Sequence, residues 1–128
     1  MQRWRTAILG LIGLASLAAG SAQAQEGSRR AYEGLWGSNQ QACRDEDGVD
    51  RMEITGHRFF WYETRCEARE IRNQGGQSWT LRMACQGEGQ RFSARPRIIL
   101  PSPDRLVMER SPVGPTRRQT YVRCIGSR

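Results

Sequence analysis

The chain has 128 residues, with 20 basic side chains against 13 acidic ones and a formal net charge of +7, and every basic side chain is arginine. A chain of this length forms one domain at most. Its composition excludes a large multidomain enzyme, a polytopic membrane protein and a coiled-coil or collagen-like rod. Composition therefore bounds the architecture and the compartment, but it leaves the molecular function open.

Residues 1–24 have the pattern of a secretory signal peptide. Arg3 and Arg5 form a basic start, residues 6–20 carry no charge, and Ala22-Gln23-Ala24 provides the small-x-small pattern that signal peptidase reads. The apolar stretch of about 15 residues is shorter than the roughly 20 that a membrane-spanning helix needs. We therefore expect cleavage and export to the periplasm or the cell exterior. The remaining chain has 18 arginines against 13 acidic residues, a net charge of +5, and no transmembrane span.

The first part of the exported chain predicts a flexible leader and then a hairpin. Residues 25–33 are polar and are expected to form the leader, and a single domain is expected over residues 34–128. Within that domain, residues 51–55 and 58–64 flank Gly56-His57. A two-residue connection that begins with glycine is typical of a tight β-hairpin.

Later segments also favour short strands. Residues 78–85 alternate apolar and polar side chains, the pattern of a half-buried strand. Strands are also expected at residues 91–94, 97–100, 105–110 and 118–124, whereas residues 67–72 are left open between strand and helix. Turn signals every eight to twelve residues predict an all-β fold, a small antiparallel up-and-down barrel or sandwich of about seven to eight short strands.

The four cysteines all lie in the exported part of the chain. An even number in a short exported chain predicts two disulfides, and the long gaps between them do not suit a zinc site. Cys66 and Cys85 flank the turn signal Asn73-Gln74-Gly75-Gly76, so we prefer Cys66–Cys85 together with Cys43–Cys124. The pairing Cys43–Cys66 with Cys85–Cys124 remains open from sequence.

Several of these residues carry a resemblance to known proteins. Gly34-Leu35-Trp36 resembles the Gly-x-Trp that opens the first strand of lipocalin-like barrels. The exported chain is also similar to a group of small, uncharacterised exported bacterial proteins that share an ordered frame of motifs. In this sequence the frame consists of Gly34, Trp36, Cys43, Cys66, Trp79, Cys85-Gln86-Gly87-Glu88-Gly89 and Tyr121-Val122-Arg123-Cys124. The resemblance implies a lipocalin-like small β-barrel and export, and it assigns no catalytic or binding residue.

No set of residues predicts catalysis. The acidic residues 45–50 do not match the ligand spacing of a calcium loop. His57 is the sole histidine, it lies in the predicted hairpin turn, and the sequence has no nucleophile elbow to partner it. We therefore expect a protein that is not an enzyme, with no metal site and no cofactor.

The arginines are the remaining candidates for a functional surface. Guanidinium groups bind phosphates and carboxylates through two parallel hydrogen bonds. The candidate anion-binding residues are Arg95, Arg97, Arg117, Arg118 and Arg123. Aromatic residues lie among the arginines, as on surfaces that bind nucleic acid, but export argues against nucleic acid as a partner. The competing interpretation is a coding bias toward arginine on an ordinary solvated surface.

These observations lead to one main hypothesis and two alternatives. The main hypothesis is a monomeric, non-catalytic β-barrel module in the periplasm or outside the cell that binds an anionic envelope polymer or a protein partner. The first alternative is a small inhibitor of a lysozyme or protease, which presents residues 45–50 or Pro112-Val113-Gly114-Pro115. The second alternative is a lipocalin-like carrier of a small apolar ligand.

Overall fold

The computed structural model describes residues 10, 13 and 30–126 and contains nine strands and one short helix within them. The strands are β1 (Gly34–Gly37), β2 (Arg51–Thr55), β3 (Arg58–Trp61), β4 (Thr64–Asn73), β5 (Ser78–Gly87), β6 (Gln90–Ala94), β7 (Arg97–Ser102), β8 (Arg105–Glu109) and β9 (Arg118–Arg123). A 3-10 helix, η2, spans Ala42–Arg44. Apart from Gly10 and Gly13, the predicted signal peptide over residues 1–24 lies outside the described residues.

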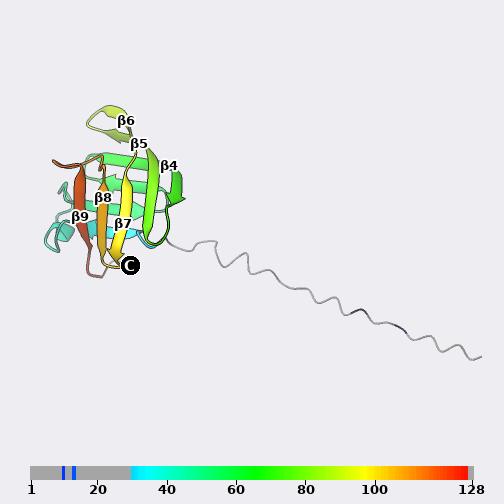
Figure 1. The fold of residues 1–128 in the computed structure, drawn as a ribbon. Helices are drawn as coiled ribbons and strands as arrows, with labels where there is room; N and C mark the ends of the chain where they lie inside the picture. The colour runs from blue at the N-terminus through cyan, green and yellow to red at the C-terminus, as the bar shows by residue number, and fades with distance from the viewer. Residues whose placement is uncertain (1–9, 11–12, 14–29, 127–128) are drawn as a thin grey trace, which may run out of the picture.

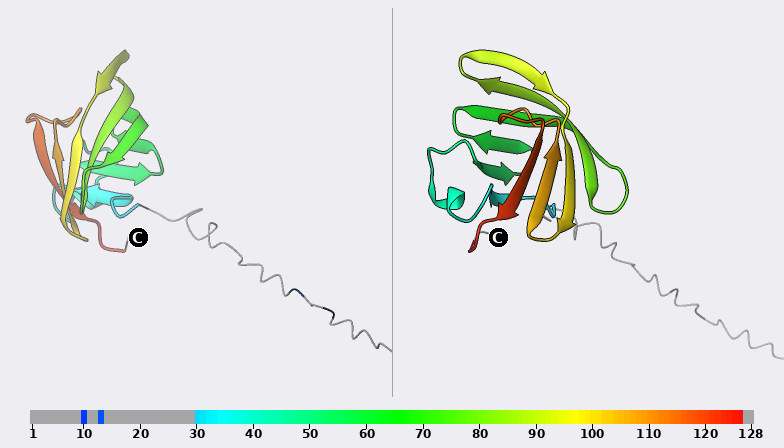
Figure 2. Two further views of the ribbon diagram at one scale, coloured as in Figure 1. Left: turned by 45° about the vertical axis from the view of Figure 1, so that its right-hand side comes forward. Right: turned by 60° about the vertical axis from the view of Figure 1, so that its left-hand side comes forward.

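Eight of the strands close into an antiparallel barrel. Strands β1 to β5 pair in chain order, β7 to β9 continue the sheet, and β9 returns to β1. The extra strand, β6, pairs with β5 and stands above the rest of the barrel (Figure 1; Figure 2). This architecture confirms the predicted all-β fold and fits a lipocalin-like barrel.

The predicted hairpin forms at Gly56-His57, and the undecided segment is a strand. The second strand of the hairpin ends at Trp61 rather than at residue 64, because Tyr62 and Glu63, the latter with φ of +61°, turn the chain into β4. Gly56 has φ of +60°, a conformation that favours glycine, in the turn between β2 and β3. Residues 67–72 belong to β4, where Cys66 and Ala68 point into the barrel and their neighbours are exposed. A bulge between Ala68 and Glu70 shifts this alternation by one residue. The helical interpretation of residues 67–72 is therefore excluded.

The core lies along the barrel axis and begins before the first strand. Its largest fully buried side chains include Trp36, Phe59 and Met52. Tyr32 is also fully buried, with its ring centroid 5.0 Å from that of Trp79. Residue 32 belongs to the segment predicted as a flexible leader, so the packing of the domain includes residues before Gly34. The polar composition of residues 25–33 did not indicate this packing, because a single aromatic side chain, Tyr32, is enough to anchor the segment.

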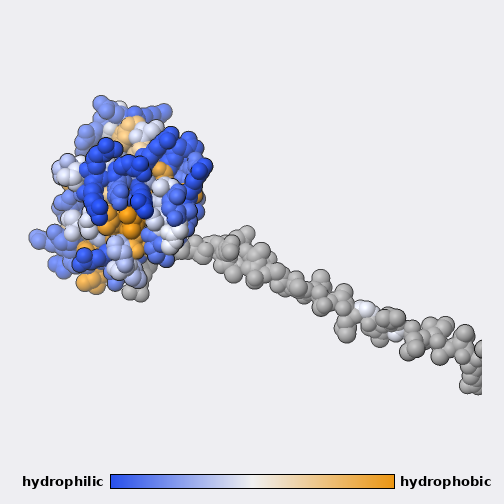
Figure 3. Space-filling model, in the orientation of Figure 1, coloured by the Kyte–Doolittle hydropathy of each residue, from blue (hydrophilic) through white to orange (hydrophobic). Residues whose placement is uncertain are grey.

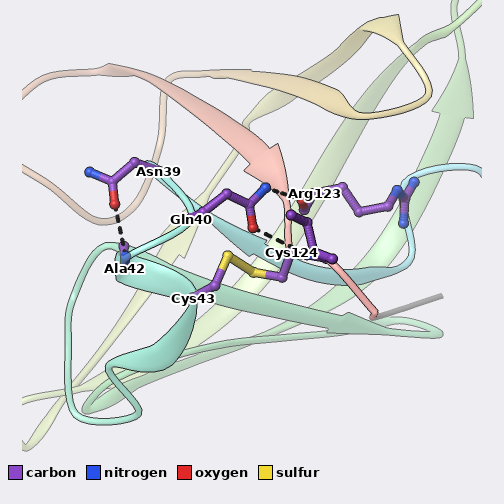
Figure 4. The surroundings of a disulfide bond; sticks show 7 residues. Asn39, Gln40, Ala42, Cys43, Arg123 and Cys124 are labelled. Carbon is purple, nitrogen blue, oxygen red and sulfur yellow. Dashed lines mark hydrogen bonds between the residues drawn. A yellow bond between two sulfur atoms is a disulfide. The ribbon is translucent and has the colours of Figure 1, made fainter.

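Both disulfides follow the preferred pairing. Cys66 and Cys85 are directly opposite each other on β4 and β5, and Cys43 is bonded to Cys124. The second bond is supported by Gln40, whose amide nitrogen donates to the Arg123 carbonyl at 2.9 Å (Figure 4). The alternative pairing is therefore wrong, and the two bonds suit an oxidising compartment.

Gly37 leaves space for the second disulfide. A Cβ atom at this position would lie 2.9 Å from the Sγ atom of Cys43. The last residue of β1 therefore needs to be glycine for η2 to pack so closely. Among the residues that the structure describes, no helix is long and apolar enough to cross a membrane.

Candidate functional site

Four residues form a row across the outer surface of β3, β4, β5 and β6. Phe60 is opposite Arg65, Arg65 is opposite Gln86, and Gln86 is opposite Arg91. All four side chains are exposed. Directly opposite residues bring their Cβ atoms to about 5 Å, and Arg65 and Arg91 are therefore roughly 10 Å apart, since two strand spacings separate them.

A fifth residue, Arg58, joins this row at the same surface pocket. The pocket has a volume of about 580 Å³ and is lined by Arg58, Phe60, Arg65, Gln86 and Arg91, among others. We call these five residues the β3–β6 outer face. Within the described residues, none of its three arginines has an acidic partner within ion-pair distance. Glu67 lines the same pocket and is directly opposite Arg58, whereas the residues directly opposite Arg65 and Arg91 are uncharged, so these two arginines carry the positive charge that is available to a ligand.

A second basic pocket lies around Glu70 and is more nearly neutralised. Its volume is about 540 Å³, and its arginines are Arg72, Arg82, Arg95 and Arg110. Glu70 accepts from Arg72 and lies 3.4 Å from the guanidinium of Arg82. Two of the four positive charges are thus paired with one carboxylate. The predicted candidate Arg95 lies here, on the link between β6 and β7.

Arg123, another predicted candidate, has a structural position. Its guanidinium carbon lies 4.3 Å from the centroid of the Trp36 ring, and its side chain is only 12% exposed. The guanidinium donates to the carbonyls of Ala31, Glu33 and Pro103 at 2.7, 2.8 and 3.0 Å. These contacts hold the residues before β1 against the last strand. The donors of Arg123 are therefore directed at the chain itself.

The three other predicted candidates do not form one site with Arg95. Arg97 on β7 is opposite Glu109, and Glu109 is opposite Arg118 on β9, so one carboxylate lies between two arginines. Arg97 also donates to the Ser78 hydroxyl at 3.1 Å. Arg117 is exposed in the loop before β9.

The face shown in Figure 3 is mostly hydrophilic, with an apolar area near its centre.

Most of the aromatic residues among the arginines belong to the core. Phe59, Trp61 and Tyr121 are buried, and the Trp61 indole donates to the Tyr121 hydroxyl at 3.2 Å. Burial raises the pKa of Tyr121. Tyr62 and Phe92 are exposed, and so is Phe60, which the sequence interpretation passed over and which belongs to the β3–β6 outer face. Period-two alternation could have found it, because neighbours in a strand face opposite sides and Phe59 and Trp61 face inward.

The loops proposed for inhibition are arranged differently from each other. Val113 is partly buried and packs against the core, and its carbonyl accepts from the Ser111 hydroxyl at 2.6 Å. Residues 45–50 are largely exposed, and the Gly48 N–H donates to the Asp45 carbonyl at 3.0 Å.

In the described part of the chain, no group of three or more acidic, histidine or cysteine side chains is placed to hold a metal ion.

Comparison with protein-family models, with curated proteins and with solved structures found no match to this chain. What this protein binds is therefore inferred from the chain's own residues. The strongest of them are the three arginines of the β3–β6 outer face, which form no ion pair with any described acidic residue, and the exposed ring of Phe60.

Proposed function

We propose that this protein is an exported, non-catalytic binding module that uses the β3–β6 outer face to hold an anionic polymer of the cell envelope. The observation that carries the proposal is the in-register row of Phe60, Arg65, Gln86 and Arg91. An extended surface on a rigid sheet suits a polymer better than a single small anion, because two charges along the polymer can meet Arg65 on β4 and Arg91 on β6 at the same time.

The chemistry of the five residues supports an anionic group as the ligand. Each arginine offers a planar set of N–H donors that fits a phosphate, sulfate or carboxylate. Gln86 lies between Arg65 and Arg91 and adds a neutral amide that can donate or accept. Phe60 provides an apolar surface between Arg65 and the exposed Glu53 of β2, on which a sugar ring or an acyl chain can pack.

The proposal also states that the protein is exported and which group of proteins it belongs with. The basic start, the uncharged stretch and the small-x-small pattern at residues 22–24 support a cleaved signal peptide. The two disulfides support an oxidising destination. On this proposal the protein belongs with the small exported bacterial proteins that share its frame of Gly-x-Trp, four cysteines and Tyr-x-Arg-Cys.

Salt-dependent binding tests the proposal. The protein is titrated with a heparin fragment of defined length and with lipopolysaccharide at several salt concentrations, and the dissociation constants are measured by fluorescence anisotropy. Contacts with fixed charges weaken as salt screens them, so the affinity should fall steeply as salt increases. If the protein does not bind either probe at low ionic strength, the β3–β6 outer face is ordinary solvated surface.

A further inference from the structure

Strand β6 has an unpaired edge. Within the described residues it pairs with β5 alone, and it is the terminal strand of the sheet. Gln90, Arg91, Phe92 and Ser93 are all exposed, and Phe92 retains 38% of its surface. An open strand edge presents backbone donors and acceptors to any second strand that approaches it.

The orientation of the backbone groups on β6 follows from its partner strand. The Leu81 N–H donates to the Pro96 carbonyl at 3.0 Å, so it points toward the side of β5 on which β6 lies. Alternate residues of a strand point their backbone groups to the same side, and Cys85 therefore points toward β6 as well. The short Cα–Cα distance of 4.0 Å between Cys66 and Cys85 agrees, because it is typical of a pair without hydrogen bonds on the β4 side.

The free edge of β6 is consequently formed by two residues. Phe92 is opposite Cys85, so its N–H and C=O groups are directed at β5. The N–H and C=O groups of Arg91 and Ser93 then point away from β5, toward the open edge. A second antiparallel strand would bond to these two residues and would place its own side chains opposite theirs.

We infer that the protein forms a two-fold dimer in which β6 pairs antiparallel with β6 of a second copy, centred on Phe92. In this register Phe92 is opposite Phe92 of the second copy, in the pair without hydrogen bonds. Arg91 is opposite Ser93 of the second copy, in the hydrogen-bonded pair. The segment Gln90-Arg91-Phe92-Ser93-Ala94 is self-complementary in this sense, because no two charges of like sign are directly opposite.

The dimer would also extend the surface described above. Pairing about a two-fold axis perpendicular to the sheet keeps the outer faces of both copies on the same side. The row that ends at Arg91 in each copy would then continue into the second copy through Ser93, Ala84, Glu67 and Arg58. The inference itself rests on the edge of β6 and stands whether or not the outer face binds an anion.

Two substitutions at one exposed position test the register. Ser93→Arg places an arginine opposite Arg91 of the second copy, twice in each dimer, and Ser93→Glu places a carboxylate there instead. We expect the dimer dissociation constant to rise about tenfold for Ser93→Arg and to fall about tenfold for Ser93→Glu, since each directly opposite charged pair is repeated by symmetry. The protein expressed from the full chain is measured by sedimentation equilibrium without any polyanion.

A charge-swapped variant provides the matched control. Arg91→Glu combined with Ser93→Arg restores an opposite-charge pair in the same register, so it should dimerise more tightly than Ser93→Arg alone. Thermal unfolding checks that each variant retains the fold, which is expected for exposed substitutions. The inference is overturned if the parent protein stays monomeric at millimolar concentration, or if Ser93→Arg and Ser93→Glu change the dissociation constant in the same direction.

Discussion

The guanidinium of Arg123 lies over the ring of Trp36, with 4.3 Å between the guanidinium carbon and the ring centroid. Trp36 is fully buried on β1, and its indole donates to the Tyr32 carbonyl at 2.8 Å. The two side chains thus connect the first strand, the last strand and the residues before β1. Because these segments are far apart in sequence, the contact joins the two ends of the folded chain.

Replacing Arg123 should therefore weaken the fold. We expect Arg123→Ala to lower the free energy of unfolding by about 2–4 kcal/mol, since it removes a cation–π contact and the charged donors of several hydrogen bonds. Arg123→Lys should lose part of this, because an ammonium group lacks the planar fork. Urea denaturation measures both, with Arg118→Ala as the exposed control. Equal effects of Arg123→Ala and Arg118→Ala would contradict this role.

Tyr32 predicts a loss of stability at alkaline pH. Burial raises the pKa of Tyr32 from 10.0 to about 12. Below pH 10 its hydroxyl is protonated in both states, and the stability that this contributes is fully present. Between pH 10 and about 12 the unfolded chain binds fewer protons than the folded one, so the free energy of unfolding falls as pH rises.

Tyr32→Phe should reduce that alkaline loss, which urea denaturation at pH 9 to 12 would measure. At pH 7 the same variant should gain up to about 1 kcal/mol, because the Tyr32 hydroxyl is buried without a hydrogen-bond partner among the described residues. The burial of Tyr121 acts in the same direction, so some loss should remain. An unchanged pH dependence in Tyr32→Phe would rule out Tyr32 as its source.

The two disulfides should contribute unequally. Cys43–Cys124 has a sequence separation of 81 residues, and Cys66–Cys85 has one of 19. On the chain-entropy model their removal costs about 4.5 and about 3.3 kcal/mol, respectively. Paired alanine variants compared by thermal unfolding should follow this order. Peptide mapping without reduction should recover only these two cross-links, and the opposite stability order would show that packing around β4 and β5 outweighs loop length.

The fold was predictable where local patterns were strong. The alternation of Trp79, Leu81 and Met83 identified β5, and Gly56-His57 identified the turn between β2 and β3. The alternation in β4 was interrupted by the bulge after Ala68, which is why residues 67–72 remained ambiguous. Residues 91–94 and 97–100 were predicted as separate strands, but the sequence does not show that β6 pairs with β5 alone and lies outside the closed barrel, because this depends on which distant strands meet.

The sequence predicted that arginines form the candidate site, but it did not predict which arginines lie together. The sequence identifies many arginines, but strand register decides which of them meet, and register depends on contacts between distant segments. Arg65 and Arg91 are 26 positions apart in the printed sequence and are brought together by two hairpins. Arg123 was predicted as a candidate anion-binding residue, whereas in the structure it packs on Trp36.

The most direct test of the central claim compares two double variants for binding to the same heparin fragment at low salt. Arg65→Ser with Arg91→Ser removes two charges from the β3–β6 outer face, and Arg117→Ser with Arg118→Ser removes two exposed charges elsewhere, so both variants have the same net charge. We predict that the first variant binds at least about tenfold more weakly than the parent and the second less than about threefold more weakly. Equal losses in the two variants would contradict a localised site, since they would show that net charge alone governs binding.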